Sequence, residues 1–314
     1  MEATEKKPKV SVCVVTYNQQ DYIRQCLQSI VGQVTNFNFE VIVGDDCSTD
    51  GTRLIVQEFV DRYPGVVKPI FNIKNIGPYE NFLLVHKDAR GDYIAHVDGD
   101  DYCLPGKLQA QADLLDKDSK CNIVWHRMLI DISGVTYEGS LQINNIEALK
   151  LDRGNIIQYM SLAGQSSKMY RKSVRDFAMP DFDMIDYFVN VEQVGSGIVR
   201  FVSSKYYGVY RMGVGIASSG TKTRKLLGKS FIYFYEKYPE HRLEVNTAVL
   251  VCLLGDIKNR RKTWKMYFQI WIRTFQIGSL LNLMRSVKFL KSTTLKKELI
   301  KAYPSETAAR QTRI

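Results

Sequence analysis

The chain has 314 residues, 45% of them hydrophobic and 11% aromatic, and this composition excludes an intrinsically disordered protein. Its six cysteines include no C-x-x-C pair, which argues against a cysteine zinc site and favours buried thiols in a reducing compartment. The net charge of +10 is uneven, because residues 221–314 hold 20 Lys and Arg against 6 Asp and Glu, whereas the preceding residues hold 23 against 27. The basic C-terminal region therefore needs an explanation of its own.

The first hundred residues alternate apolar runs with amphipathic stretches, which predicts an α/β layer structure. A continuous β-branched run predicts a buried strand at 10–16, and apolar residues at three- and four-residue spacing predict a helix from Ile23 to Val31. The pattern repeats with strands at 39–43, 66–71 and 93–97, a helix that carries Leu54 and Phe59, and a helix near 79–87. Because a parallel sheet binds ligands at the carboxyl ends of its strands, the polar clusters that follow these strands are site candidates.

The second half begins with a helix that restarts at Pro105, followed by a strand at 123–130. The signal is mixed from 156 to 219, with strand candidates at 167–170 and 198–202 and a helix near 185–191. From residue 222 the periodicity is helical nearly to the end. No apolar run approaches the roughly 20 residues of a membrane span, and the polar N-terminus lacks a secretory signal, so we expect a cytoplasmic location.

The acidic cluster Asp98-Gly99-Asp100-Asp101 directly follows the strand at 93–97. Three carboxylates within four positions repel one another, and a hard divalent cation with oxygen ligands relieves that repulsion. Mg²⁺ or Mn²⁺ held between a carboxylate and a diphosphate would neutralise a departing nucleotide. An Asp-rich turn explains the same tetrapeptide equally well, because Asp and Gly both favour turns.

A second acidic block, Asp45 to Thr52, follows the strand at 39–43. A carboxylate at such a place accepts hydrogen bonds from a nucleobase or ribose, as an acidic residue does in dinucleotide-binding folds. Ser48, Thr49 or Asp50 can instead cap the next helix, which leaves Asp46 for the ligand.

Taken in order, these motifs resemble glycosyltransferases of family 2, which have the GT-A fold. That fold is α/β, with a Rossmann-like, mostly parallel nucleotide-binding sheet and helices on both faces. The motifs are Val10-Ser11-Val12 through Thr16-Tyr17-Asn18, Asp45-Asp46-x-Ser48-x-Asp50-x-Thr52, Asn75-x-Gly77, Gly91-Asp92-Tyr93-Ile94, Asp98-x-Asp100-Asp101 and Pro105-x-Lys107-Leu108. The resemblance covers about residues 8–218. It implies a catalytic domain at 8–220, with a nucleotide-sugar half at 8–102 and an acceptor half at 103–220, before a basic helical region at 221–314.

The resemblance also implies roles for single residues. Thr16 and Tyr17 would line the nucleobase, Asp46 would bind its N–H edge, Asp98 would touch the ribose, and Asp100 would be the main metal ligand. The expected donor-binding residues are Thr16, Tyr17, Asn18, Asp45, Asp46, Asn75, Gly77, Asp98 and Arg211, and the expected metal ligands are Asp100 and Asp98. Gly213 stands where the family frequently has a histidine, so diphosphate and water are expected to complete the shell. Arg211 would bind phosphate, or equally pack at a strand end.

The family uses an acidic residue before a helix as the general base on the acceptor hydroxyl. The candidates here are Asp181, Asp183 and Asp186, of which Asp186 best matches the start of the family's helix and Asp183 comes second. Ile185 replaces the Glu of the family's usual Glu-Asp pair. His96, two residues before the acidic cluster, fits a core histidine better than a catalytic one.

The basic region carries an aromatic stripe at helical spacing, flanked by cations. The stripe comprises Trp264, Tyr267, Phe268, Trp271, Ile272 and Phe275. Such a face suits a helix lying on an anionic membrane surface, which would make the protein peripheral on the inner face of the plasma membrane. The same face could instead pack on the catalytic domain, and we expect no nucleic-acid partner because no known motif accompanies it.

These observations predict an inverting glycosyltransferase that uses Mn²⁺ or Mg²⁺. It would move a sugar from a nucleotide-diphosphate donor, most simply a UDP-sugar, to a hydroxyl of a glycan or lipid-linked oligosaccharide in polysaccharide biosynthesis. A sugar-nucleotide nucleotidyltransferase is the alternative enzyme, although residues 16–20 are not the glycine-rich loop that it needs. A non-catalytic, membrane-associated sugar-nucleotide-binding protein is the alternative outside enzymes.

Overall fold

The computed structural model describes residues 7–139, 141, 143, 145–160, 162–214 and 220–293, and side chains as far as residue 289. Ser218, the first six residues and the end of the basic region, from residue 294 onward, lie outside the described residues.

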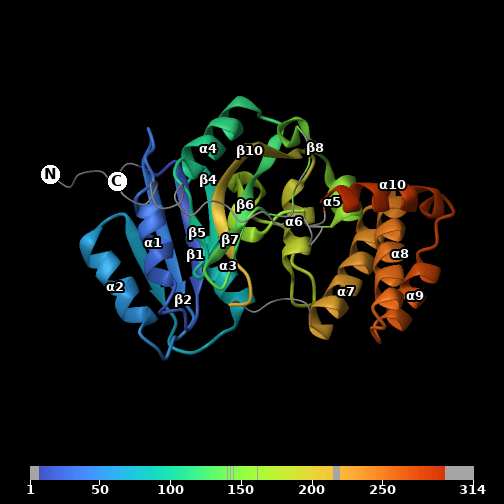
Figure 1. Cartoon of the computed structure of the whole chain (residues 1–314), viewed down its shortest axis with the longest axis horizontal. Coiled ribbons are helices and arrows are strands. Elements are labelled where there is room, and N and C mark those ends of the chain that lie inside the picture. Colours follow the sequence, from blue (N-terminus) through green and yellow to red (C-terminus); the bar gives the residue numbers. More distant parts are fainter. Residues whose placement is uncertain are drawn as a thin grey trace.

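Within the described residues a ten-stranded sheet forms the centre of the molecule (Figure 1), in the order β3-β2-β1-β4-β9-β6-β10-β5. The nucleotide half contributes four parallel strands: β1 Val10–Thr16, β2 Phe39–Asp45, β3 Val67–Phe71 and β4 Tyr93–Asp98. The rest of the sheet comprises β9 Met169–Arg171, antiparallel to both neighbours, the parallel pair β6 Cys121–Ile132 and β10 Ile198–Arg211, and the short antiparallel strands β5 Tyr102–Cys103, β7 Val135–Tyr137 and β8 Lys150–Leu151. The sheet is therefore mostly parallel, as predicted.

Helices cover both faces of the sheet, because alternate residues of the buried strands point to opposite sides. Val12 and Val14 of β1 belong to one apolar cluster, whereas Cys13 between them belongs to the other. The helices that precede the basic region are α1 Ile23–Val31, α2 Thr52–Arg62, α3 Pro78–Asp88, α4 Lys107–Lys117, α5 Arg153–Tyr159 and α6 Asp186–Val194.

The described part of the basic region, as far as residue 293, forms helices that pack as a group against α5 and α6, at the right of Figure 1. They are α7 Thr221–Lys237, α8 Arg242–Lys258, α9 Trp264–Arg273 and α10 Gly278–Thr293. Aromatic rings of α6 and α7 pack against one another, with the Phe188 and Phe234 centroids 5.0 Å apart and those of Tyr187 and Phe231 5.6 Å apart. Among the described residues, no helix is both long and apolar enough to span a bilayer.

The predicted strands and helices of the first hundred residues are confirmed, with differences of one or two residues at some of their ends. Strand β2 continues to Asp45, which is therefore a strand residue. Helix α2 buries Val56 and Phe59, whereas Leu54, which was predicted to belong to this helix, is 72% exposed. In the second half, α5, β5, β7 and β8 were not predicted, because segments of two to seven residues carry too little periodicity.

Candidate active site

The acidic cluster and the loop after β1 form one continuous surface. The N–H of Gly99 donates to the carbonyl of Val15 at 2.9 Å. A Cβ at position 99 would lie 2.9 Å from the Cβ of Thr16 and 2.4 Å from Oε1 of Gln19. Since contacts this short leave no room for a side chain, glycine at this position allows the two loops to touch. Thr16 is fixed in turn by a 2.8 Å hydrogen bond from its hydroxyl to Gln19 Oε1.

The loop after β1 is also joined to the loop after β2. The N–H of Asn18 donates to the Ser48 hydroxyl at 2.9 Å, and Asn18 Oδ1 accepts from the N–H of Thr49 at 2.8 Å. Asn18 adopts a left-handed conformation, with φ of 50°, that asparagine tolerates better than most residues. Asn18 therefore holds the two loops together, and Tyr17 beside it is 43% exposed at the rim of the site.

Asp46 is a buried anchor for the loop between β3 and α3. Its carboxylate accepts from the N–H groups of Ile76 and Gly77, both at 2.8 Å, and from Asn72 Nδ2 at 3.1 Å. Its carbonyl accepts from Asn75 Nδ2 at 3.2 Å. The structure thus brings together Asp46, Asn75 and Gly77, three of the predicted donor-binding residues. It shows their contacts with one another, and a contact with a nucleobase remains a prediction.

Asp45 faces a different partner. Its Oδ2 accepts from two nitrogens of Arg53, at 2.9 and 3.0 Å, and from the N–H of Ser48 at 3.2 Å. Its other oxygen is buried and has no hydrogen-bond partner among the residues that the structure describes. Asp45 and Asp46 therefore fix the walls of the site from two sides.

Both carboxylate oxygens of Asp98, at the end of β4, contact a neighbouring side chain. Oδ1 lies 3.1 Å from His96 Nε2, and Oδ2 accepts from the Ser166 hydroxyl at 3.2 Å. Burial opposes ionisation, but His96 and the Ser166 hydroxyl outweigh it and hold the pKa of the Asp98 carboxyl below its usual value. The side chain remains 39% exposed, so an ionised carboxylate is accessible to a ligand.

Asp100 and Asp101 behave differently although they are adjacent. Burial, reinforced by the charge of Asp98, raises the pKa of Asp100 to about 6. Burial and Asp98 also raise the pKa of Asp101 well above its usual value, and its Oδ1 accepts from the N–H of Arg211 at 3.0 Å. Asp101 therefore anchors the end of β10, whereas Asp100 is a carboxylate destabilised by its neighbour.

These carboxylates supply some, but not all, of the ligands that a divalent cation needs. Among the described residues, no group of three or more His, Cys, Asp and Glu side chains is placed to hold a metal ion. The pair Asp98 and Asp100 supplies hard oxygen ligands, and the repulsion that raises the Asp100 pKa would be relieved by a cation. The residues therefore fit a Mg²⁺ or Mn²⁺ ion that takes its remaining ligands from a diphosphate and water.

Arg211, the last residue of β10, is packed at the strand end. Its guanidinium donates to the carbonyl of Asp100 and to Gln25 Oε1, and it lies over the rings of Tyr22 and Tyr102, 5.1 and 4.9 Å from their centroids. Of the two predicted roles, the described contacts show the packed arginine. A contact with phosphate remains a prediction.

Of the candidate bases, Asp186 is the one that lies near the acidic cluster. It is the first residue of α6, where the helix dipole favours a negative charge. It keeps solvent-exposed surface, yet the surrounding protein raises the pKa of its carboxyl, and the charge of Asp98 raises it further. Asp183 is exposed and pairs with Lys222 at 3.0 Å.

Sequence reasoning did not identify three polar residues that lie close to Asp98 or Asp186. The Ser166 hydroxyl donates to Asp98, and Gln165 lies close enough to Asp186 to favour the ionised form of its carboxyl. Lys168 is fully buried; burial lowers the pKa of its ammonium group to about 8, although Asp186 and Asp98 favour the charged form. The detectable signal was a polar run at 165–168 directly before an apolar strand.

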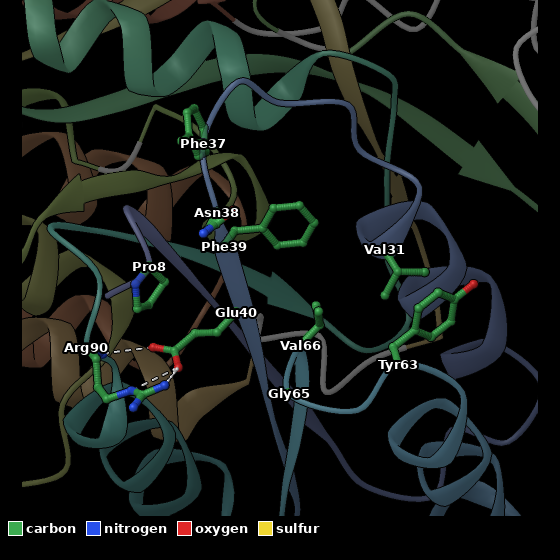
Figure 2. A pocket seen from close by; sticks show the side chains of 10 residues that line it. All are labelled: Pro8, Val31, Phe37, Asn38, Phe39, Glu40, Tyr63, Gly65, Val66 and Arg90. Atoms are coloured by element: carbon green, nitrogen blue, oxygen red, sulfur yellow. Dashed lines mark hydrogen bonds and ion pairs between the residues drawn. The ribbon is translucent and has the colours of Figure 1, made fainter. Parts of the chain in front are cut away.

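A separate pocket lies at the opposite edge of the sheet (Figure 2). Pro8 and Phe39 in its lining stand at the starts of β1 and β2, whereas the acidic clusters follow the ends of β2 and β4. The buried Glu40 at this pocket is neutralised by Arg90 at 3.1 Å and Lys68 at 3.2 Å. This pocket is therefore not part of the candidate active site.

Comparison with known proteins agrees with the geometry. Residues 11–176 match the sequence model of glycosyl transferase family 2. An uncharacterised protein of Mycobacterium tuberculosis is 32% identical over 198 residues, which are 62% of this chain and 56% of that protein, so the chain spans about half of its length. The Escherichia coli protein WfaP, named as a UDP-Glc:alpha-D-GlcNAc-diphosphoundecaprenol beta-1,3-glucosyltransferase, is 26% identical over 70% of this chain and 84% of its own length. The crystal structure of S. aureus TarS residues 1–349 with UDP-GlcNAc superposes with a TM-score of 0.63 at 20% identity, covering 91% of this chain and 81% of that 1–349 chain. The TarS likeness shows a shared fold.

Proposed function

Because this chain belongs to glycosyl transferase family 2, we propose that it transfers a sugar from a nucleoside diphosphate donor to an acceptor hydroxyl in polysaccharide biosynthesis. The observation that carries the proposal is the arrangement of Asp98, Asp100 and Asp186. The first two lie at the carboxyl end of a parallel strand, where such sheets bind nucleotides, and the third is near enough for its pKa to sense the charge of Asp98.

The raised pKa of Asp186 suits a general base, because a base works best when its pKa approaches the working pH. Asp186 takes the proton of the acceptor hydroxyl, whose oxygen attacks the anomeric carbon as the bond to the diphosphate breaks. One such displacement inverts the anomeric configuration. Asp98 and Asp100 would hold a divalent cation, which when bound supplies positive charge to the leaving diphosphate.

The donor is proposed to be a UDP-sugar, because the names of WfaP and of the TarS complex both specify a uridine diphosphate sugar. The test is a thermal-shift screen of the protein against UDP-, GDP- and dTDP-sugars with Mn²⁺. A ligand at 100 times its dissociation constant stabilises the folded state by about 2.7 kcal/mol. A shift with UDP-sugars alone supports the proposal, and no shift with any nucleotide sugar contradicts it.

We propose further that α9 and α10 dock on an anionic membrane surface near a lipid-linked acceptor. Residues 257–293 contain nine Lys and Arg and no Asp or Glu. Helices α9 and α10 and the segment between them also expose large apolar side chains: Trp264 37%, Phe268 43%, Ile272 55%, Phe275 45%, Ile277 73%, Leu281 73% and Met284 70%. Exposed apolar groups bordered by cations are the composition of an interfacial helix.

Part of the predicted aromatic stripe is buried within the basic region and part is exposed. Tyr267 is fully buried and its hydroxyl donates to the carbonyl of Arg224 at 2.8 Å, so this residue packs on α7. Phe268 and Ile272 point to solvent on the same helix. Each exposed cation near an anionic surface contributes about 1 kcal/mol.

Liposome sedimentation of the full chain tests the docking proposal. We expect binding to vesicles with anionic lipid, weaker binding to neutral vesicles, and loss of binding when Phe268→Ser is combined with Ile272→Ser. Leu54→Ser, which removes an exposed apolar side chain on α2, is the matched control and should bind as the wild type does. Equal sedimentation of the double variant and the wild type would contradict the docking surface.

A further inference from the structure

A chain of three buried side chains leads from Asp98 into the core. His96 Nε2 lies 3.1 Å from Asp98 Oδ1, His96 Nδ1 lies 2.9 Å from His86 Nε2, and His86 Nδ1 lies 2.7 Å from the Tyr170 hydroxyl. The three residues come from β4, α3 and β9 and are at most 3% exposed. Neither the proton transfer nor the cation site described above uses them.

The chemistry of these groups gives the chain a direction. A carboxylate only accepts hydrogen bonds, so His96 Nε2 carries the hydrogen that faces Asp98. Nδ1 of a neutral His96 then accepts from His86 Nε2, and His86 Nδ1 accepts from the Tyr170 hydroxyl. Each ring nitrogen has one partner in this arrangement, which meets the requirement that buried polar groups be paired.

Apolar and aromatic packing keeps the chain in place. The Phe82 ring lies 3.9 Å from the His86 ring and 5.2 Å from the His96 ring, measured between centroids. The rings of His86 and Tyr170 are stacked, with an interplanar angle of 9°. Since rings enclosed in this way cannot turn freely, the hydrogen on His96 is aimed at a fixed point.

We propose that Tyr170, His86 and His96 are positioning residues that fix the Asp98 carboxylate in the orientation that binds the nucleotide sugar. Ser166 secures the second oxygen of Asp98, so the carboxylate is held from two sides. The part of this inference that concerns donor affinity rests on the proposed function. The hydrogen-bond direction does not, and can be measured without a donor.

Long-range proton–nitrogen NMR spectra of the imidazole rings measure that direction in the intact protein. The chain has four histidines, so His126→Gln and His241→Gln identify the signals of the other two. We expect His86 and His96 each to carry a ring hydrogen on Nε2, with Nδ1 as the acceptor. A His96 ring that carries its hydrogen on Nδ1 instead of Nε2 would overturn the inference, whether or not the protein binds a nucleotide.

Tyr170→Phe removes only the hydroxyl at the far end of the chain. We expect a mixed tautomer at His86, a shifted His96 signal and roughly fivefold weaker binding of UDP-sugar by calorimetry, a change of the size expected for one buried hydrogen bond. Tyr267→Phe is the matched control, because it removes a buried hydroxyl bonded to a carbonyl in α7. It should lower the melting temperature but leave the histidine signals and donor affinity unchanged.

The two variants separate a positioning role from a structural one. Unchanged His96 signals in Tyr170→Phe would overturn the proposal, as would equal losses of donor affinity in Tyr170→Phe and Tyr267→Phe. If the wild-type protein shows the expected tautomers but binds no nucleotide sugar, the proposed function fails while the hydrogen-bonded chain stands.

Discussion

Asp46→Asn tests whether the Asp46 carboxylate builds the wall of the nucleotide site. The carboxylate accepts three hydrogen bonds, two of them from N–H groups of the loop before α3. An amide can keep the two bonds at Oδ1, but its NH2 group then faces the N–H of Gly77. A bond to a charged acceptor contributes about 1.5–3 kcal/mol, and a buried N–H left unpaired costs about 1–3 kcal/mol. The lost hydrogen bond and the unpaired N–H concern the same contact with Gly77, so the two energies are not fully additive. We therefore expect the free energy of unfolding to fall by about 3 kcal/mol.

Urea denaturation followed by circular dichroism measures this loss as a change in midpoint at constant slope. The control is Asp61→Asn, which changes an exposed carboxylate that accepts from Gln57 on α2. Such a surface substitution should alter stability by no more than about 0.5 kcal/mol. A loss below about 1 kcal/mol in Asp46→Asn would refute the anchoring role and favour Asp46 as a residue kept for the ligand alone.

Three further predictions concern the reaction. Asp186→Asn should abolish sugar transfer while calorimetry still detects donor binding. Asp183→Asn should retain transfer, because Asp183 pairs with Lys222 away from the cluster. Loss of transfer in Asp183→Asn but not in Asp186→Asn would assign the general base to Asp183. Desolvation by the surrounding protein and the charge of Asp98 raise the pKa of Asp186. The ratio kcat/KM should therefore rise with pH along an acid limb above the ordinary Asp value, and an acid limb near pH 4 would contradict this. Gly99→Ala should weaken nucleotide binding and lower the free energy of unfolding by about 1–3 kcal/mol, because the added methyl group would overlap Thr16. A binding isotherm equal to that of the wild type would show that the acidic cluster and the loop after β1 do not touch.

The sequence was sufficient to predict the nucleotide half because its signals are local. Buried parallel strands appear as continuous β-branched runs, and each is followed by the polar loop that forms part of the site. Asp98, Asp100 and Asp46 could be identified because they directly follow such strands. Most contacts of these carboxylates could not be predicted, since Asn72, which binds Asp46, and Ser166, which binds Asp98, lie 26 and 68 residues away in the sequence.

The second half of the chain was predicted less completely, again because its contacts join residues that are distant in sequence. Strand β10 spans 14 residues, but a register shift between Phe201 and Tyr206 interrupts the alternation, so only its first part was recognised. Ser166 and Lys168 became site residues only when β9 was placed beside β4 in the sheet. Pairing between strands distant in sequence is a property of the folded chain, and composition carries no record of it.

The most direct test of the central claim is an assay of nucleoside diphosphate release. Its donor is the nucleotide sugar that the thermal-shift screen selects. With a polyprenyl diphosphate-linked sugar as acceptor, the wild-type protein with Mn²⁺ should release diphosphate and form product of inverted anomeric configuration. Asp100→Ala and wild-type protein in EDTA should release none. Full turnover in both would contradict the cation site at Asp98 and Asp100, and product of retained configuration would contradict the single displacement assigned to Asp186.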